Sequence, residues 1–173
     1  MGEIKSTLDI IMEKTRGLTL TEEEKRSFKE QELAAKVKGL FQRYLGADLT
    51  RERLAEELAA LSTRGMDREK VKRVLIGEAV QAIQLGEDNN SVLKLLEIMP
   101  GIDLAALRTI LADYEKKLLI RREAQEKKLM LRLGENGISG SAVVPNLSAD
   151  REWEGLLAEM KEELRAALRS AMR

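Results

Sequence analysis

The chain has 173 residues, 43% of them hydrophobic, and its 30 basic and 30 acidic side chains give a formal net charge of zero. A chain of this length can bury a core without disulfides or structural metals, and its balanced charge provides no overall basic excess for nucleic acid. It contains neither cysteine nor histidine. This excludes zinc sites, iron–sulfur clusters and Cys–His or Ser–His catalysis within the chain.

The first hundred residues predict a series of amphipathic helices, because their apolar residues recur at intervals of three and four. Thr21 and Glu24 form a capping box, and Gly46 is a typical residue to follow a helix. The predicted helices cover residues 3–15, 22–45, a short segment after Thr50, 67–85 with Asp67 as its N-cap, and 92–99 before Pro100-Gly101. Residues 22–32 contain one large apolar residue, so we expect that half of the second helix to project into solvent or to meet a partner.

A sixth helix is predicted to begin after Asp103, which is a good N-cap residue. Its apolar residues follow a heptad-like spacing at Leu104, Leu107, Leu111, Tyr114 and Leu118. This pattern stops after Ile120, because residues 121–128 (RREAQEKK) contain only Ala124 as an apolar residue. We expect that stretch to be either a solvated helical ribbon or an arm that faces a partner.

A β-hairpin is predicted over residues 129–144. Leucines alternate with other residues before Asn136-Gly137, and this dipeptide is the strongest short signal for a two-residue hairpin turn. Such a hairpin exposes two unpaired strand edges, which soluble proteins usually cover. We therefore expect a second chain to complete one edge, with the slim residues Ser139, Gly140 and Ser141 as candidate partner-binding positions.

The last predicted helix covers residues 149–172 and follows Ser148 as its cap. Trp153 is the first of eight apolar positions on one stripe, so we expect it to anchor this helix in the core. The predicted fold is mainly α, a bundle of six to seven amphipathic helices with one small β-hairpin near the C-terminus. Residues 1–101 form an N-terminal helical region and residues 102–173 a long helix, the hairpin and a final helix.

No cofactor or metal site is predicted. Gly134, Gly137 and Gly140 are evenly spaced, but they lack the Gly-Lys-Ser/Thr ending of a phosphate loop and are better explained as turn residues. Residues 87–90 resemble the start of a calcium loop without its central glycine, and helix capping is the better explanation. Adjacent glutamates such as Glu56-Glu57 point about 100° apart on a helix and do not converge on one ion.

Charge is segregated near the C-terminus. Residues 116–132 carry seven bases and two acids, whereas residues 150–163 carry six acids and two bases. We favour pairing of these two segments with each other. The alternatives are that Lys127, Lys128 and Arg132 bind a protein partner, or that this basic arm binds nucleic acid.

One segment resembles a known family. Residues 133–157 (LGENGISGSAVVPNLSADREWEGLL) are similar to the part of ribosome recycling factor where a Gly/Asn/Ser loop, an aliphatic strand and a Pro-x-Leu-Thr/Ser lead into a long helix. In that family two long basic helices follow, whereas here one amphipathic helix remains. The N-terminal hundred residues have no counterpart in it, and we assign no family.

These observations predict a non-catalytic helical interaction or adaptor protein. The N-terminus does not have the pattern of a signal peptide and no apolar run is long enough to span a membrane, so we expect a cytoplasmic protein. Its partner is expected to be a protein, with a second copy (a homodimer) as a prominent candidate. The alternatives are a ribosome- or RNA-associated factor that uses the basic arm 116–132, and an enzyme that uses only carboxylates, Lys and Arg.

Overall fold

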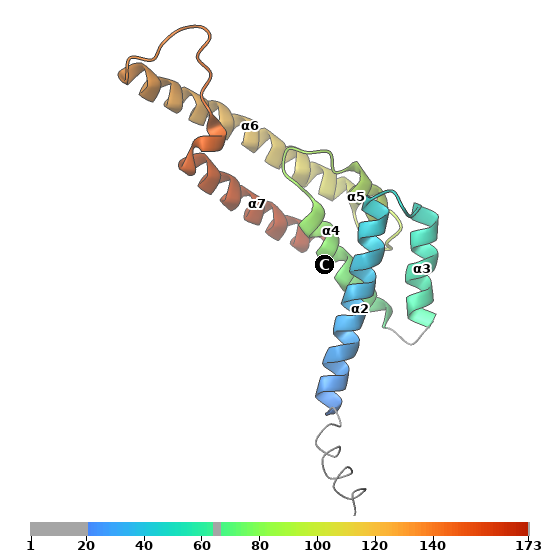
Figure 1. The fold of residues 1–173 in the computed structure, drawn as a ribbon. Coiled ribbons are helices and arrows are strands. Elements are labelled where there is room, and N and C mark those ends of the chain that lie inside the picture. Colours follow the sequence, from blue (N-terminus) through green and yellow to red (C-terminus); the bar gives the residue numbers. More distant parts are fainter. Residues whose placement is uncertain (1–20, 64–66, 173) are drawn as a thin grey trace, which may run out of the picture.

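The structure, a computed structural model, describes residues 21–63 and 67–172, and these residues are mainly helical (Figure 1). The elements are α2 (Glu22–Leu45), α3 (Arg51–Thr63), α4 (Arg68–Ala82), α5 (Asn90–Leu96), α6 (Leu104–Glu135), the 3-10 turn η1 (Leu147–Ala149) and α7 (Arg151–Ala171). The all-helical part of the prediction is thereby confirmed. The helix predicted for residues 3–15 lies outside the described residues.

Three predicted N-caps are present. At the start of α2 the Thr21 hydroxyl accepts from the Glu24 amide at 3.2 Å, and the Glu24 carboxylate accepts from the Thr21 amide at 2.7 Å. Asp67 accepts from the Glu69 amide at 2.9 Å before α4, and Asp103 accepts from two amides of the first turn of α6. Each cap satisfies amides that a helix leaves without partners, which fixes where these helices begin.

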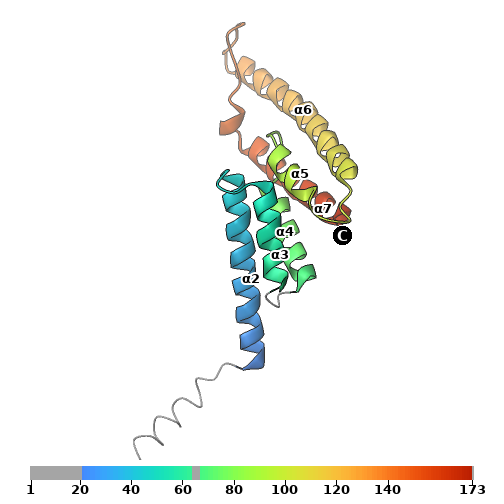
Figure 2. The same ribbon diagram turned by 90° about the vertical axis from the view of Figure 1, so that its right-hand side faces the viewer.

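Helix α4 lies at the centre of a bundle and packs against α2, α3, α5 and α7. Helices α6 and α7 run antiparallel to each other, and the C-terminal end of α7 enters the bundle (Figure 1). Figure 2 shows that the far end of α6 and the loop after it extend beyond the ends of α2 and α3. The molecule therefore has a bundle and a projecting pair of helices.

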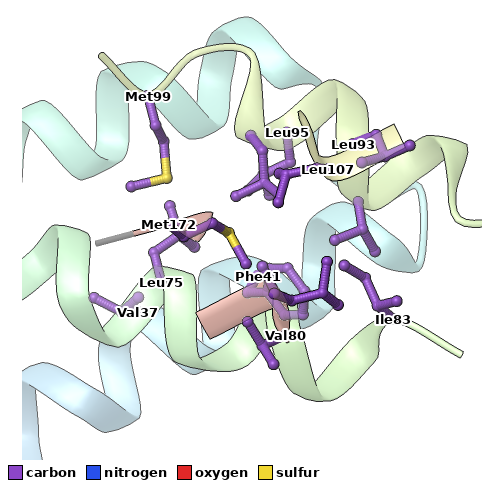
Figure 3. Packing of buried hydrophobic residues seen from close by; sticks show 14 of the residues in the cluster. Val37, Phe41, Leu75, Val80, Ile83, Leu93, Leu95, Met99, Leu107 and Met172 are labelled. Carbon is purple, nitrogen blue, oxygen red and sulfur yellow. The ribbon is translucent and has the colours of Figure 1, made fainter. Parts of the chain in front are cut away.

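The core of the bundle is one aliphatic cluster with a single large aromatic, Phe41, which is fully buried (Figure 3). Its members come from α2 to α5, from the first turns of α6 and from the last turns of α7. Leu107, Leu164 and Leu168 are fully buried in it, and Met172 reaches it from the end of α7. The cluster thus contains residues from both sides of Pro100-Gly101.

The β-hairpin predicted for residues 129–144 is wrong: the described residues contain no strand. Leu129, Leu131 and Leu133 continue α6, which ends in a Schellman motif at Asn136-Gly137. The Ile138 amide donates to the Leu133 carbonyl at 2.9 Å.

An Asn-Gly pair cannot distinguish a hairpin turn from a helix end, since both need a positive φ at glycine, and Gly137 has φ +75°. The unbranched residues before it are good helix formers, and a lone hairpin is marginal in water. The helix therefore continues to Glu135. Ser139, Gly140 and Ser141 form no strand and therefore cannot offer a strand edge to a second chain.

Other helix boundaries also differ from the prediction, including both ends of α5, which spans Asn90–Leu96 and not 92–99. Asp150, not Ser148, caps α7: it accepts from the Glu152 amide at 3.3 Å, and Ser148 lies in η1. Helix α4 ends at Ala82, because the buried side chain of Asn89 bonds both the amide and the carbonyl of Gln84, at 2.9 and 2.8 Å. These bonds hold the chain in a turn, whereas the spacing of apolar residues in the sequence predicted a helix that continues to Leu85.

Candidate interaction surface

The projecting part of the molecule, which we call the arm, comprises residues 119–160: the distal half of α6, the loop, η1 and the first half of α7 (Figure 1). Every residue of the arm is described. Its buried residues are Gln125, Trp153 and Met160, and none of the three belongs to the core cluster of the bundle. Trp153 is buried as predicted, but in the arm and not in the main core.

The inner face of α6 in the arm contacts α7 through polar side chains. Gln125 is 5% exposed, and its amide nitrogen donates to the Asp150 carboxylate at 2.5 Å. Lys128 forms an ion pair with Glu152, and Arg132 approaches the same carboxylate at 3.5 Å. The basic end of α6 thus lies beside the acidic start of α7, and one glutamate receives two of the three candidate bases.

These contacts stabilise the charged forms of both carboxylates. The hydrogen bond from Gln125 lowers the pKa of Asp150, and the amides of Glu152 and Trp153 act in the same direction. The hydrogen bond from Lys128 lowers the pKa of Glu152, with a further contribution from Gln125. Both groups are therefore ionised at neutral pH.

Most of the basic stretch is engaged within the chain. Arg122 pairs with Glu126 at 2.9 Å, and the ammonium group of Lys117 lies 4.3 Å from the centre of the Tyr114 ring. With Lys128 and Arg132, four of the seven bases of residues 116–132 have an internal partner. Lys127 differs, since it lines a groove on another side of α6 and joins no ion pair found among the described residues.

The opposite side of α6 presents exposed apolar residues to solvent. Leu119, Ile120 and Leu131 are 58%, 68% and 71% exposed. Residues three and four apart share one face of a helix. These three therefore lie on one stripe, which we call the outer face of α6, and its members are Leu119, Ile120, Glu123, Lys127, Met130 and Leu131.

A shallow groove of about 630 Å³ lies along the distal part of the outer face. The last residues of the loop form its other wall, where Val144 is 83% exposed. Its lining residues are Glu123, Glu126, Lys127, Met130, Leu131, Val143, Val144 and Pro145. The groove is therefore apolar in its distal part and charged where Glu123, Glu126 and Lys127 line it.

The predicted candidate residues are divided among three places. Lys127 is in the groove, Lys128 and Arg132 face α7, and Ser139, Gly140 and Ser141 form an exposed turn that does not line the groove. Sequence reasoning missed Leu119, Ile120 and Met130. Their three- and four-residue spacing with Glu123 and Lys127 was a usable signal, but it is visible only when the helix is continued past residue 128.

A second groove, of about 730 Å³, lies between α3, α4 and the residues that follow α5. Its lining residues are Ala55, Leu58, Ala59, Arg68, Glu69, Val71, Lys72, Leu75, Ile98, Met99 and Pro100. Among them Glu69 is the one carboxylate, so this lining lacks the paired carboxylates that general acid–base catalysis would use here.

No described helix is both long and apolar enough to cross a membrane. No group of three or more acidic side chains lies close enough to hold a metal ion, within residues 21–63 and 67–172.

Comparison of the chain with protein-family models, with curated proteins and with solved structures finds no match.

Proposed function

We propose that this chain is a non-catalytic helical interaction protein that binds a protein partner, which can be a second copy, through the outer face of α6. One observation carries the proposal: three large apolar side chains on one stripe of a helix are more than half exposed beside a groove whose wall includes the exposed Val144. Large apolar side chains that are exposed together with charged neighbours are typical of sites where proteins bind one another. The proposal includes a cytoplasmic location, with which the absence of cysteine is compatible.

The charge distribution favours a protein partner over RNA. A nucleic-acid surface needs bases that are free to neutralise phosphates along one face. Here Lys128 and Arg132 are directed to Glu152, and Arg122 is paired with Glu126. The outer face itself carries one acid and one base, Glu123 and Lys127, between its two apolar ends, which suits an amphipathic helix of mixed charge better than a polyanion.

Site-specific photocrosslinking in cells tests the proposal. A photoreactive benzoylphenylalanine at Lys127 places the probe between the two apolar ends of the outer face. We expect one discrete protein adduct, which Leu131→Glu abolishes because it puts a charge into the apolar contact. The matched control is Phe28→Glu, which alters another exposed apolar residue (63% exposed) on α2 and should leave the adduct unchanged.

The products separate the alternatives. An adduct whose mass includes RNA, lost when Lys128 and Arg132 are also replaced with Gln, would favour the ribosome- or RNA-associated function. An adduct that persists in the Leu131→Glu variant would contradict binding through the outer face.

A further inference from the structure

The residues of the outer face of α6 are arranged symmetrically about one position of the helix. Position 125 lies halfway between Leu119 and Leu131, halfway between Ile120 and Met130, and halfway between Glu123 and Lys127. An antiparallel copy of the same helix, centred on position 125, would therefore place apolar residues opposite apolar residues. The same register would place each Glu123 opposite a Lys127. A twofold contact requires this kind of self-complementarity, in which one patch fits a second copy of itself.

The groove gives this register a matching shape. In each copy Leu119 and Ile120 project from a bare stretch of helix, whereas Met130 and Leu131 lie in the groove beside Val144. Antiparallel pairing brings the projecting pair of one copy to the groove of the other, twice. The stripe runs from Leu119 to Leu131, which is 12 residue steps or about 18 Å of helix.

The contacts between α6 and α7 leave the outer face available. The inner face of α6 is engaged with α7 through Gln125, Lys128 and Arg132, so the internal pairing does not use the outer face. Arg122 pairs with Glu126, which leaves Glu123 and Lys127 as the oppositely charged groups at the centre of the stripe.

We propose that a second copy of this chain occupies the outer face of α6, in an antiparallel twofold contact centred on position 125. The inference rests on the proposed function, because it names the partner of that same surface.

Sedimentation velocity of the purified full chain at micromolar to tens of micromolar concentration, in low salt, tests the contact. Wild type should be a dimer, and Leu131→Glu a monomer with unchanged helical content. Glu123→Lys or Lys127→Glu alone turns both symmetric ion pairs into like-charge pairs, which should raise the Kd on the order of tenfold. An equimolar mixture of these two variants restores opposite charges and should dimerise again, as should the double variant with both charges exchanged.

Single-cysteine variants fix the register, since the native chain has no cysteine to interfere. In the proposed pair Glu123→Cys of one copy lies opposite Lys127→Cys of the other, while identical positions are offset by about 6 Å along the axis. Under mild oxidation the mixed disulfide should form faster than either symmetric one, because disulfide geometry tolerates little displacement.

The outcomes distinguish this inference from the function on which it rests. A wild-type monomer at tens of micromolar, or a dimer unaffected by Leu131→Glu, would overturn self-association through this face. In that case a cellular crosslink from position 127 to a different protein would leave the proposed function standing. Faster symmetric than mixed disulfides would overturn the antiparallel register.

Discussion

The bundle and the arm are both helical, but different forces hold them together. In the bundle, fully buried side chains from six helices form one continuous, mainly aliphatic cluster. In the arm two helices meet around one indole, one methionine and one buried amide, and the rest of their contact is polar. The stabilisation from apolar burial depends little on pH, whereas the stabilisation from hydrogen bonds to carboxylates depends on it strongly.

Because of this difference, the bundle should determine the stability of the whole fold, and the arm should be the part that responds first to a change in pH. A change in the bundle should lower the stability of the whole fold, since α4 contacts α2, α3, α5 and α7 together. A change in the arm should loosen the α6–α7 contact first, because none of the buried residues of the arm belongs to the core cluster of the bundle. The four tests that follow probe this contrast.

The largest effect is expected from Phe41→Ala. Phe41 is the one aromatic of the core cluster and is fully buried, so its truncation leaves a cavity in the bundle. We expect a loss of about 3–5 kcal/mol in the free energy of unfolding, measured by urea denaturation. Phe28→Ala on the exposed half of α2 is the control and should change stability by less than about 0.5 kcal/mol. Equal losses in the two variants would contradict this account of the core.

Trp153→Ala should cost about 3 kcal/mol, at the low end for an aromatic truncation, because the arm can close partly around the gap. Trp153 is 7% exposed and is the only tryptophan, so native fluorescence reports on the arm alone. In wild type we expect a blue-shifted emission maximum. During unfolding it should move to the red before the helical signal of the bundle is lost. Emission typical of exposed indole in the native protein would refute the burial.

Gln125→Ala should cost about 1 kcal/mol, because it removes a buried amide and its hydrogen bond to Asp150. Gln31→Ala, at an exposed position of α2, is the matched control and should be nearly neutral. Thermal unfolding followed through Trp153 fluorescence measures both variants. A neutral Gln125→Ala variant would mean that this hydrogen bond does not hold the arm.

The smallest effect concerns pH. The folded-state pKa values of Asp150 and Glu152 lie below their ordinary values of 3.8 and 4.5. Their contribution is therefore present above the unfolded-state values and is lost as the pH falls through the lower folded-state ones.

We expect the arm, followed through Trp153 fluorescence, to loosen below about pH 4 before the bundle does. An Asp150→Asn and Glu152→Gln double variant should show less of this acid sensitivity. The comparison is the shift in midpoint temperature between pH 7 and pH 3, and an identical shift in both proteins would contradict the assignment.

The sequence predicted the bundle well because its signals are local. The Thr21–Glu24 capping box and the Asp67 and Asp103 caps lie next to the helices that they start, and side chain and backbone interact within three residues. The end of α4 was missed because it depends on Asn89, a residue seven positions beyond Ala82 whose burial the pattern does not reveal.

The arm was predicted poorly because its central signal is ambiguous. Asn136-Gly137 satisfies a hairpin turn and a helix end equally well, and choosing the hairpin assigned Leu129, Leu131 and Leu133 to a strand. That choice broke the helical spacing that links Leu119 and Ile120 to Met130 and Leu131. The opposite charges of α6 and α7, in contrast, correctly indicated that the two segments lie side by side.

The unbroken course of α6 from the bundle into the arm also sets a length. Its 32 residues correspond to a rod of about 48 Å, and position 125 lies about 30 Å from the start of the helix. In the antiparallel pair the two bundles would therefore be held about 60 Å apart, facing away from each other at the ends of a common shaft. Such a pair is a molecular ruler: whatever the bundles contact is presented at two points whose spacing is fixed by the number of residues in one helix.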